Sequence, residues 1–168
     1  MKRNFVKIIS GTILTLAVIS AAAFGIAYGQ EENKAEFQNG GGRLEGTWNA
    51  RVAITNCQTG AEIRSFASIG TFMSGGTMLD STSGMAQALK TPGHGVWSHL
   101  AGNTYKFAFK SFSFDAAGVF TGWTIIRHEA VLNSKGDEYA SSGTAEFYAP
   151  NGTLTGTGCS STTAERFQ

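Results

Sequence analysis

Apolar and polar residues alternate with a period of two along most of the chain, the spacing of β-strands rather than of helices. In the stretch 48–54, WNARVAI, every second residue is apolar, so one face should be buried and the other wet. Only 83–90, SGMAQALK, is expected to form a short helical turn. We expect strands at about 44–54, 63–72, 77–83, 95–100, 104–114, 119–133, 138–149 and 153–163.

The expected strands are joined by short segments that contain typical turn residues. Examples are SGG at 74–76, DAAG at 115–118, SKGD at 134–137 and PNG at 150–152. Such turns connect antiparallel neighbours, so the chain should fold as an all-β meander of about eight strands. This pattern fits either an up-and-down barrel or a sandwich. No exact repeat is present, which argues against a propeller or solenoid.

The two cysteines favour the barrel. Cys57 ends the first expected strand, and Cys159 lies in the last; these strands become neighbours only when a meander closes. We expect a disulfide between them, the alternative being two separate thiols in strands that do not meet. A bridge closing about 100 residues would stabilise the fold by up to roughly 4–5 kcal/mol in the chain-entropy model.

The segment 105–114, YKFAFKSFSF, contains five aromatic rings whose parity changes. The rings stand at odd positions up to Phe109 and at even positions from Phe112. A β-bulge at Lys110-Ser111 would bring all five to one side and bend the strand as a barrel requires. Without a bulge, the rings would divide between the inside and the outside.

The N-terminus has the features of an export signal. Lys2, Arg3 and Lys7 precede a mostly apolar run at 8–28, and small residues stand at 27 and 29. We therefore interpret 1–29 as a signal peptide, 30–43 as a flexible polar leader and 44–168 as the β-barrel domain. The mature protein would be secreted or periplasmic, the alternative being a retained membrane anchor.

The charge of the chain excludes some partners. The sequence has 13 basic and 12 acidic residues, and loss of the signal would leave 10 basic against 12 acidic, a net charge of −2. A nearly neutral chain with scattered charges predicts binding neither to nucleic acid nor to anionic membranes. The oligomeric state is left open.

The first expected strand begins with Gly46-Thr47-Trp48. This motif resembles the Gly-x-Trp of the lipocalin-like, or calycin, barrels: lipocalins, fatty-acid-binding proteins and avidins. The resemblance implies that Trp48 plugs the closed end of a barrel under a basic side chain, for which Arg166 is our candidate. Avidins match best in length and in the shortness of their turns. However, Ala50 and Ile54 stand where the first strand of avidins supplies polar contacts to biotin, so biotin binding is not predicted.

No catalytic, metal or cofactor site is nominated from the sequence. The three histidines, His94, His99 and His128, lack the spacing of a metal site. No serine lies in a Gly-x-Ser-x-Gly elbow, and the glycine-rich stretch 155–159 lacks the lysine and helix of a phosphate loop.

An internal pocket is the remaining candidate, because small barrels either fill with side chains or hold one small ligand. Met85 and Leu89 are expected as a lid at its rim. The alternative is that the same residues fill the core completely. The expected lumen residues are Met78, Tyr105, Phe107, Phe109, Phe112, Phe120, Ile126 and His128.

Three functions follow from these expectations. The first is an exported lipocalin-like protein that binds a small apolar molecule inside the barrel, open at the end opposite Trp48. The second is a barrel isomerase similar to allene oxide cyclases, with His128, Tyr105 or Tyr139 facing a buried pocket. The third is a protein-binding barrel of the inhibitor type, which would use the leader at 31–43 or the loop at 84–95.

Overall fold

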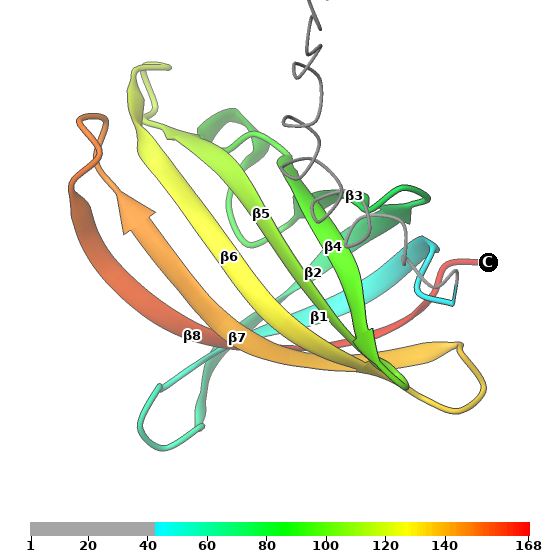
Figure 1. The fold of residues 1–168 in the computed structure, drawn as a ribbon. Helices are drawn as coiled ribbons and strands as arrows, with labels where there is room; N and C mark the ends of the chain where they lie inside the picture. The colour runs from blue at the N-terminus through cyan, green and yellow to red at the C-terminus, as the bar shows by residue number, and fades with distance from the viewer. Residues whose placement is uncertain (1–42) are drawn as a thin grey trace, which may run out of the picture.

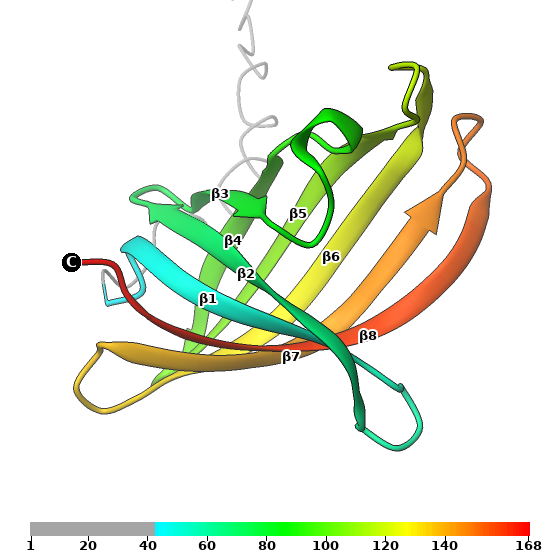
Figure 2. The ribbon, with the colours of Figure 1, turned by 180° about the vertical axis from the view of Figure 1, so that it is seen from behind.

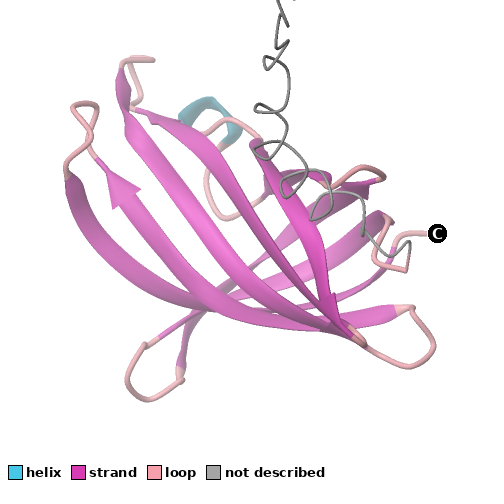
Figure 3. Cartoon of the chain, viewed as in Figure 1, coloured by secondary structure: helices cyan, strands magenta, loops and turns pink. Residues whose placement is uncertain are grey.

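The computed structural model describes residues 43–168. The predicted signal peptide (1–29) and all but the last residue of the leader (30–43) lie outside the described residues. Residues 43–168 form a closed antiparallel barrel with a single short helical turn, as Figure 3 shows. The predicted all-β fold is confirmed, and closure decides for a barrel over a sandwich.

The strands follow one another around the barrel in chain order. The one helical element, η1, is a 3₁₀ turn at Gln87–Leu89, inside the segment expected to be helical. The strands are β1 Gly46–Thr55, β2 Glu62–Met73, β3 Thr77–Thr82, β4 Gly93–Ala101, β5 Thr104–Phe114, β6 Phe120–Leu132, β7 Glu138–Tyr148 and β8 Leu154–Arg166.

The barrel closes through β1 and β8, which run side by side in Figures 1 and 2. Their pairing extends from Trp48 opposite Arg166 to Thr55 opposite Cys159. At this last rung Cys57 and Cys159 form a disulfide, with their Cα atoms 5.2 Å apart. The predicted bridge is therefore confirmed, and it links the first and last strands where closure brings them together.

The two ends of the barrel differ. Trp48 and the C-terminus lie at one end, which we call the closed end, together with the turns 74–76, 102–103 and 133–137. The disulfide lies at the other, which we call the open end, with the connections 56–61, 83–92, 115–119 and 149–153. In Figure 1 the C-terminus and the tips of the β5–β6 and β7–β8 connections mark these opposite ends.

Large inward side chains fill the closed half. Trp48 packs edge-on against Tyr139 at 5.0 Å between ring centroids, and Phe72 contacts both Trp97 and Phe107 in the same way. Edge-to-face packing of this kind adds to the free energy gained by burying the rings. The core cluster consists of Leu44, Trp48, Phe72, Met78, Trp97, Tyr105, Phe107, Ala130, Leu132, Tyr139 and Ala164.

Arg166 seals this end over Trp48. Its guanidinium carbon lies 4.4 Å from the ring centroid of Trp48, and the indole Nε1 of Trp48 donates a hydrogen bond of 2.9 Å to the Leu44 carbonyl. The guanidinium also donates to the backbone carbonyls of Arg43, Glu45 and Gly136. One side chain thus joins the segment before β1, the β6–β7 turn and the end of β8, and its position over Trp48 is the contact implied by the family resemblance.

The expected bulge at Lys110-Ser111 is absent. Lys110 pairs with Ile125 and Ser111 with Thr124 in unbroken register, and the irregularity falls later, between Ser113 and Phe114. Strand parity is therefore kept, so Phe112 projects from the outer face and is 44% exposed. The prediction that all five rings of 105–114 share one side was wrong.

The outward rings are stabilised by one another on the surface of β5, β6 and β7. Phe112 lies edge-on to Phe120 at 5.8 Å, and Trp123 stacks on both Phe120 and Tyr148. The ammonium of Lys110 lies 4.1 Å from the ring centroid of Trp123. The aromatic rings on the outer face therefore pack against one another. A bulge that would turn Phe112 into the lumen is not required.

Candidate functional site: the cavity in the open half of the barrel

The open half of the barrel contains a cavity of about 180 Å³. Its floor is formed by core side chains of the closed half, among them Phe72, Phe107 and Tyr139. Its lining extends to Arg64 and Met85, which are exposed to solvent. The lumen is thus filled at the end of Trp48 and hollow toward the opposite end, where it reaches the surface.

Two glycines of β4 shape one wall. An added Cβ would lie 2.4 Å from the Phe109 ring at Gly93, and 2.0 Å from the Ala108 carbonyl oxygen at Gly95. Any side chain at these positions would force the wall to move. The absence of side chains at these two positions therefore leaves room for Phe109 beside β4, where its ring lines the cavity.

A charged pair lies inside the cavity. Asp80 on β3 accepts a 2.6 Å hydrogen bond from the hydroxyl of Ser68, and its other oxygen is 3.9 Å from the ammonium of Lys90. Both charged side chains are about seven-eighths buried, at 13% and 15% exposure. Burial raises the pKa of the Asp80 carboxyl and lowers the pKa of the Lys90 ammonium, because each charge loses hydration.

A histidine with two serine partners forms a second polar group. His128 Nδ1 lies 2.9 Å from the Ser141 hydroxyl, and Nε2 lies 2.8 Å from the Ser160 hydroxyl. Burial lowers the pKa of His128 to about 4, so the ring is neutral near pH 7, with one nitrogen donating and the other accepting. Gly143 leaves the space for this ring, since a Cβ there would lie 2.6 Å from its Cδ2 atom.

Ser111 differs from these hydroxyls because it has no partner. It is 1% exposed and lines the cavity, and its Oγ is the only buried side-chain nitrogen or oxygen in residues 43–168 without a hydrogen bond. Buried polar atoms are nearly always satisfied, and an orphan costs stability. Such an atom in a cavity wall is a feature that a ligand could use.

The connection between β3 and β4 borders the opening. Lys90 forms an isolated β-bridge with Ser113, and the hydroxyl of Thr91 accepts a hydrogen bond from the Phe112 amide. At the other end of the connection, Arg64 donates to the Gly84 carbonyl. Figure 2 shows this segment curling back beside β5. Met85 lines the cavity, as expected of a lid residue, whereas Leu89 does not.

The structure divides the predicted lumen residues into three groups. Tyr105 points inward but is packed in the filled half, against Trp97 and His99. Phe112 and Phe120 belong to the outer aromatic cluster, so their placement in the lumen was wrong. The predicted residues that line the cavity are Met78, Phe107, Phe109, Ile126 and His128.

Sequence reasoning missed the polar lining, namely Asp80, Lys90 and Ser111. Asp80 could have been found, because strand alternation places it on the face of Met78, which was predicted to point inward. Lys90 lies outside the regular strands, so no periodicity indicated its direction. Ser111 was concealed by the expected bulge, which would have turned it away from the lumen.

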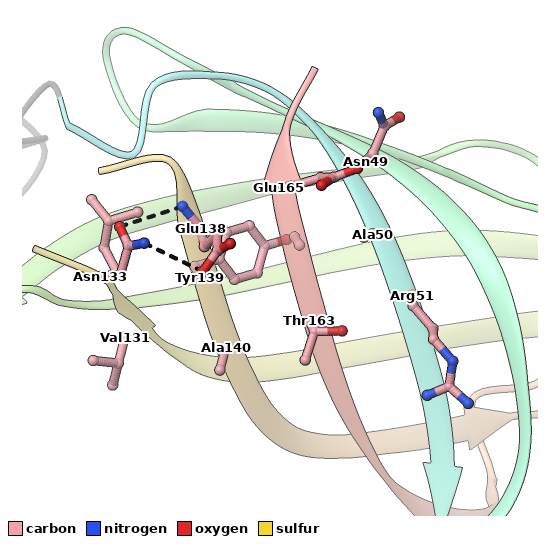
Figure 4. A pocket seen from close by; sticks show the side chains of 12 residues that line it. Asn49, Ala50, Arg51, Val131, Asn133, Glu138, Tyr139, Ala140, Thr163 and Glu165 are labelled. Atoms are coloured by element: carbon pink, nitrogen blue, oxygen red, sulfur yellow. Dashed lines mark hydrogen bonds between the residues drawn. The ribbon is translucent and has the colours of Figure 1, made fainter. Parts of the chain in front are cut away.

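A wider depression of about 770 Å³ lies on the outer face of β1, β6, β7 and β8, as Figure 4 shows. The outward side chains that line it, such as Asn49, Arg51 and Glu165, are exposed, and Asn133 hydrogen-bonds to Glu138 at its edge. The depression is shallow, and its charged side chains Arg51, Glu138 and Glu165 are exposed to solvent. We therefore take the internal cavity as the candidate site.

Residues 43–168 contain neither a metal-binding cluster nor a membrane-spanning helix. In this part of the chain, histidines, cysteines and acidic residues nowhere gather in a group of three or more that could hold a metal ion. The same residues include no helix long and apolar enough to cross a membrane.

No family model matches the chain, and no curated protein matches it. Among solved structures, the chain is similar to the crystal structure of Rv2717c from M. tuberculosis, with 12% identity over 75% of this chain and 94% of that chain and a TM-score of 0.38. The protein is an eight-stranded closed antiparallel barrel, consistent with a lipocalin-like barrel fold.

Proposed function

We propose that the protein binds a small, mainly apolar molecule in the open half of its barrel. The observation that carries this proposal is the cavity of about 180 Å³, which lies above a fully packed floor and reaches exposed residues at the open end. A barrel that served only as a scaffold could fill this space with larger side chains, as its own closed half does.

The size and lining of the cavity limit the ligand. A cavity of roughly 150 Å³ lined by apolar side chains is large enough for benzene, so this space accommodates a ring or a short chain, with further atoms extending through the mouth. Phe107, Phe109 and Ile126 supply the apolar contact. The charged pair of Asp80 and Lys90 supplies the polar contact that fixes orientation in most small-molecule sites.

The isomerase alternative has some support, because His128 and Tyr139 both line the cavity and burial raises the pKa of Tyr139. However, both ring nitrogens of His128 are already hydrogen-bonded to serines, and its low pKa makes it a weak base. We therefore favour binding over catalysis. The protein-binding alternative rests on the leader at 31–43, of which only Arg43 is described, or on the loop at 84–95, whose Met85 and Lys90 line the cavity.

The test is to fill the cavity without disturbing the barrel. Gly70 lines the cavity, and a Cβ there would meet only the Leu79 carbonyl oxygen at an ordinary 3.9 Å. We expect Gly70→Leu to occupy the lumen, to fold normally, and to lose the small molecules that native mass spectrometry detects on the wild-type protein purified from its natural source.

The matched control is Ala67→Leu, which adds a similar side chain to the exposed outer face of the same strand. It should keep the wild-type ligands. If wild-type protein carries no small molecule, and a panel of apolar compounds neither binds it nor raises its melting temperature, the proposed function is wrong.

A further inference from the structure

We propose that the ligand carries a single negative charge, a carboxylate, which binds to the ammonium of Lys90 and to the hydroxyl of Ser111. This inference rests on the proposed function and specifies its ligand class. It is argued from the hydrogen-bonding capacity left unused inside the cavity, from the charge of the lining and from the position of the two donors.

The polar groups in the cavity that still lack hydrogen-bond partners are donors. The Lys90 ammonium has three N–H groups, and within residues 43–168 its one polar partner is Asp80 at 3.9 Å, which is too long for a hydrogen bond. The hydroxyl of Ser111 has no partner, so it can rotate about its Cα–Cβ bond toward an acceptor without breaking an existing hydrogen bond. Asp80, by contrast, already accepts a short bond from Ser68.

The two donors lie on the same wall. The backbone of Lys90 bridges to Ser113 on β5, and Ser113 is the next inward residue after Ser111 on that strand. Asp80 on β3 pairs with Gly93 on β4, and the ring of Phe109 covers the position of Gly93. Lys90 and Ser111 both line the cavity, so an acceptor group can approach both donors from the lumen.

The charge of the lining matches a monoanion. The charged residues that line the cavity are Arg64, Asp80 and Lys90, which gives a net charge of +1, and His128 is neutral near pH 7. One carboxylate neutralises this charge, whereas a phosphate dianion would leave an unbalanced negative charge in a partly dehydrated site. Arg64, at the exposed rim, would attract the anion as it enters.

The apolar part of the ligand would lie against the floor. Phe107, Phe109 and Met78 form apolar lining, and the nearly parallel rings of Phe107 and Phe109, 6.4 Å apart between centroids, offer aromatic contact to a bound ring. A short-chain acid with a phenyl group fits both the polar and the apolar parts of the site.

The experiment compares two probes of nearly the same shape, 3-phenylpropionate and 3-phenylpropan-1-ol, by isothermal titration calorimetry at pH 7. We expect the carboxylate to bind at least about tenfold more tightly, since a charge-assisted hydrogen bond contributes about 1.5–3 kcal/mol and 1.4 kcal/mol is tenfold. Lys90→Met should remove this preference and leave alcohol binding within about threefold. Ser111→Ala should weaken carboxylate binding about two- to fivefold.

Asp80→Asn provides a test of opposite sign. It removes the negative charge next to Lys90 while preserving the shape of the side chain, so carboxylate binding should tighten about threefold or more while alcohol binding stays unchanged. A merely structural role for the pair would not produce a gain. Lys135→Met, in the exposed β6–β7 turn, is the control for loss of a lysine elsewhere and should have no effect.

The outcomes separate the two proposals. If the two probes bind equally, and neither Lys90→Met nor Asp80→Asn changes their ratio, the carboxylate site is wrong while small-molecule binding stands. If neither probe binds, the carboxylate site is likewise wrong, and the ligands found by native mass spectrometry decide the proposed function separately. Should Lys90→Met fail to fold, the uncharged double variant Asp80→Asn/Lys90→Met and the single Asp80→Asn variant carry the test.

Discussion

The two halves of the barrel are built from the same eight strands, yet one is filled and the other hollow. Along β7 the inward residue at the closed end is Tyr139, whereas Ser141, Gly143 and Ala145 follow toward the open end, before Phe147 near the rim. Along β5 the large Phe107 and Phe109 give way to Ser111 in the same direction. The difference lies in the volume of the inward side chains, because the register shifts only near the strand ends.

The halves also differ in how completely their polar groups are hydrogen-bonded. In the closed half the indole nitrogen of Trp48 and the guanidinium of Arg166 donate hydrogen bonds to backbone carbonyls. The open half contains a loose ion pair and an orphan hydroxyl. The polar groups that seal the closed end thus have partners, whereas part of the polar lining of the open half lacks them.

Removing Trp48, which fills the closed end, should have the largest effect on stability. Trp48→Ala deletes a fully buried ring and leaves Arg166 without its aromatic partner, so we expect a loss of about 5 kcal/mol in unfolding free energy. Urea denaturation measures it. Trp123→Ala, which removes a tryptophan from the outer cluster, should cost about 1 kcal/mol; equal losses would contradict the distinction between the halves.

Removing the disulfide at the open end should cause the second-largest loss of stability. The double change Cys57→Ser/Cys159→Ser opens a loop with a sequence separation of 102, and the chain-entropy model gives a loss of up to roughly 4–5 kcal/mol. Thermal and urea unfolding measure the loss. Hydrogen exchange should accelerate near Thr55 more than near Trp48, because the rung between Trp48 and Arg166 keeps its cap. A uniform acceleration would show that the halves do not open separately.

Acid should weaken the barrel through His128, where the two halves meet. The folded-state pKa of about 4 lies below the ordinary 6.5, so between these values the unfolded chain binds a proton that the folded chain does not. Stability therefore falls as pH drops from 6.5 toward 4, by ~3 kcal/mol from this residue. Urea midpoints at pH 7 and pH 4 measure the loss.

His128→Gln should remove that part of the acid loss, because glutamine stays neutral and can still bond to Ser141 and Ser160. The control His94→Gln, on the exposed face of β4, should keep it. An acid loss of the same size in His128→Gln and wild type would show that His128 is not the residue responsible.

Much of this fold could be predicted from local patterns. Alternation located the strands, turn residues located the connections, and the two cysteines indicated which strands close the barrel. The main error came from β5, where a change of ring parity was interpreted as a bulge, and Phe120 at the start of β6 was also placed inside. The actual reason for the parity is a second aromatic cluster outside, formed with Trp123 and Tyr148 from other strands, and such a partner surface leaves no local signal in the segment 105–114.

The site was predictable only in its apolar part. Phe107, Phe109 and Ile126 follow from strand parity, whereas the meeting of Asp80 with Lys90 depends on how the connection after β3 folds back to Ser113. That path is set by contacts between segments far apart in the sequence.

The sequence by itself determined which residues alternate, where the chain turns and therefore that an antiparallel barrel forms, because these depend on interactions between near neighbours. Only the tertiary structure decided that the lumen is half filled, since a cavity is the difference between the space the strands enclose and the summed volume of side chains from all of them. The same holds for the unpartnered hydroxyl of Ser111: whether a polar atom finds a partner is decided by every strand that surrounds it.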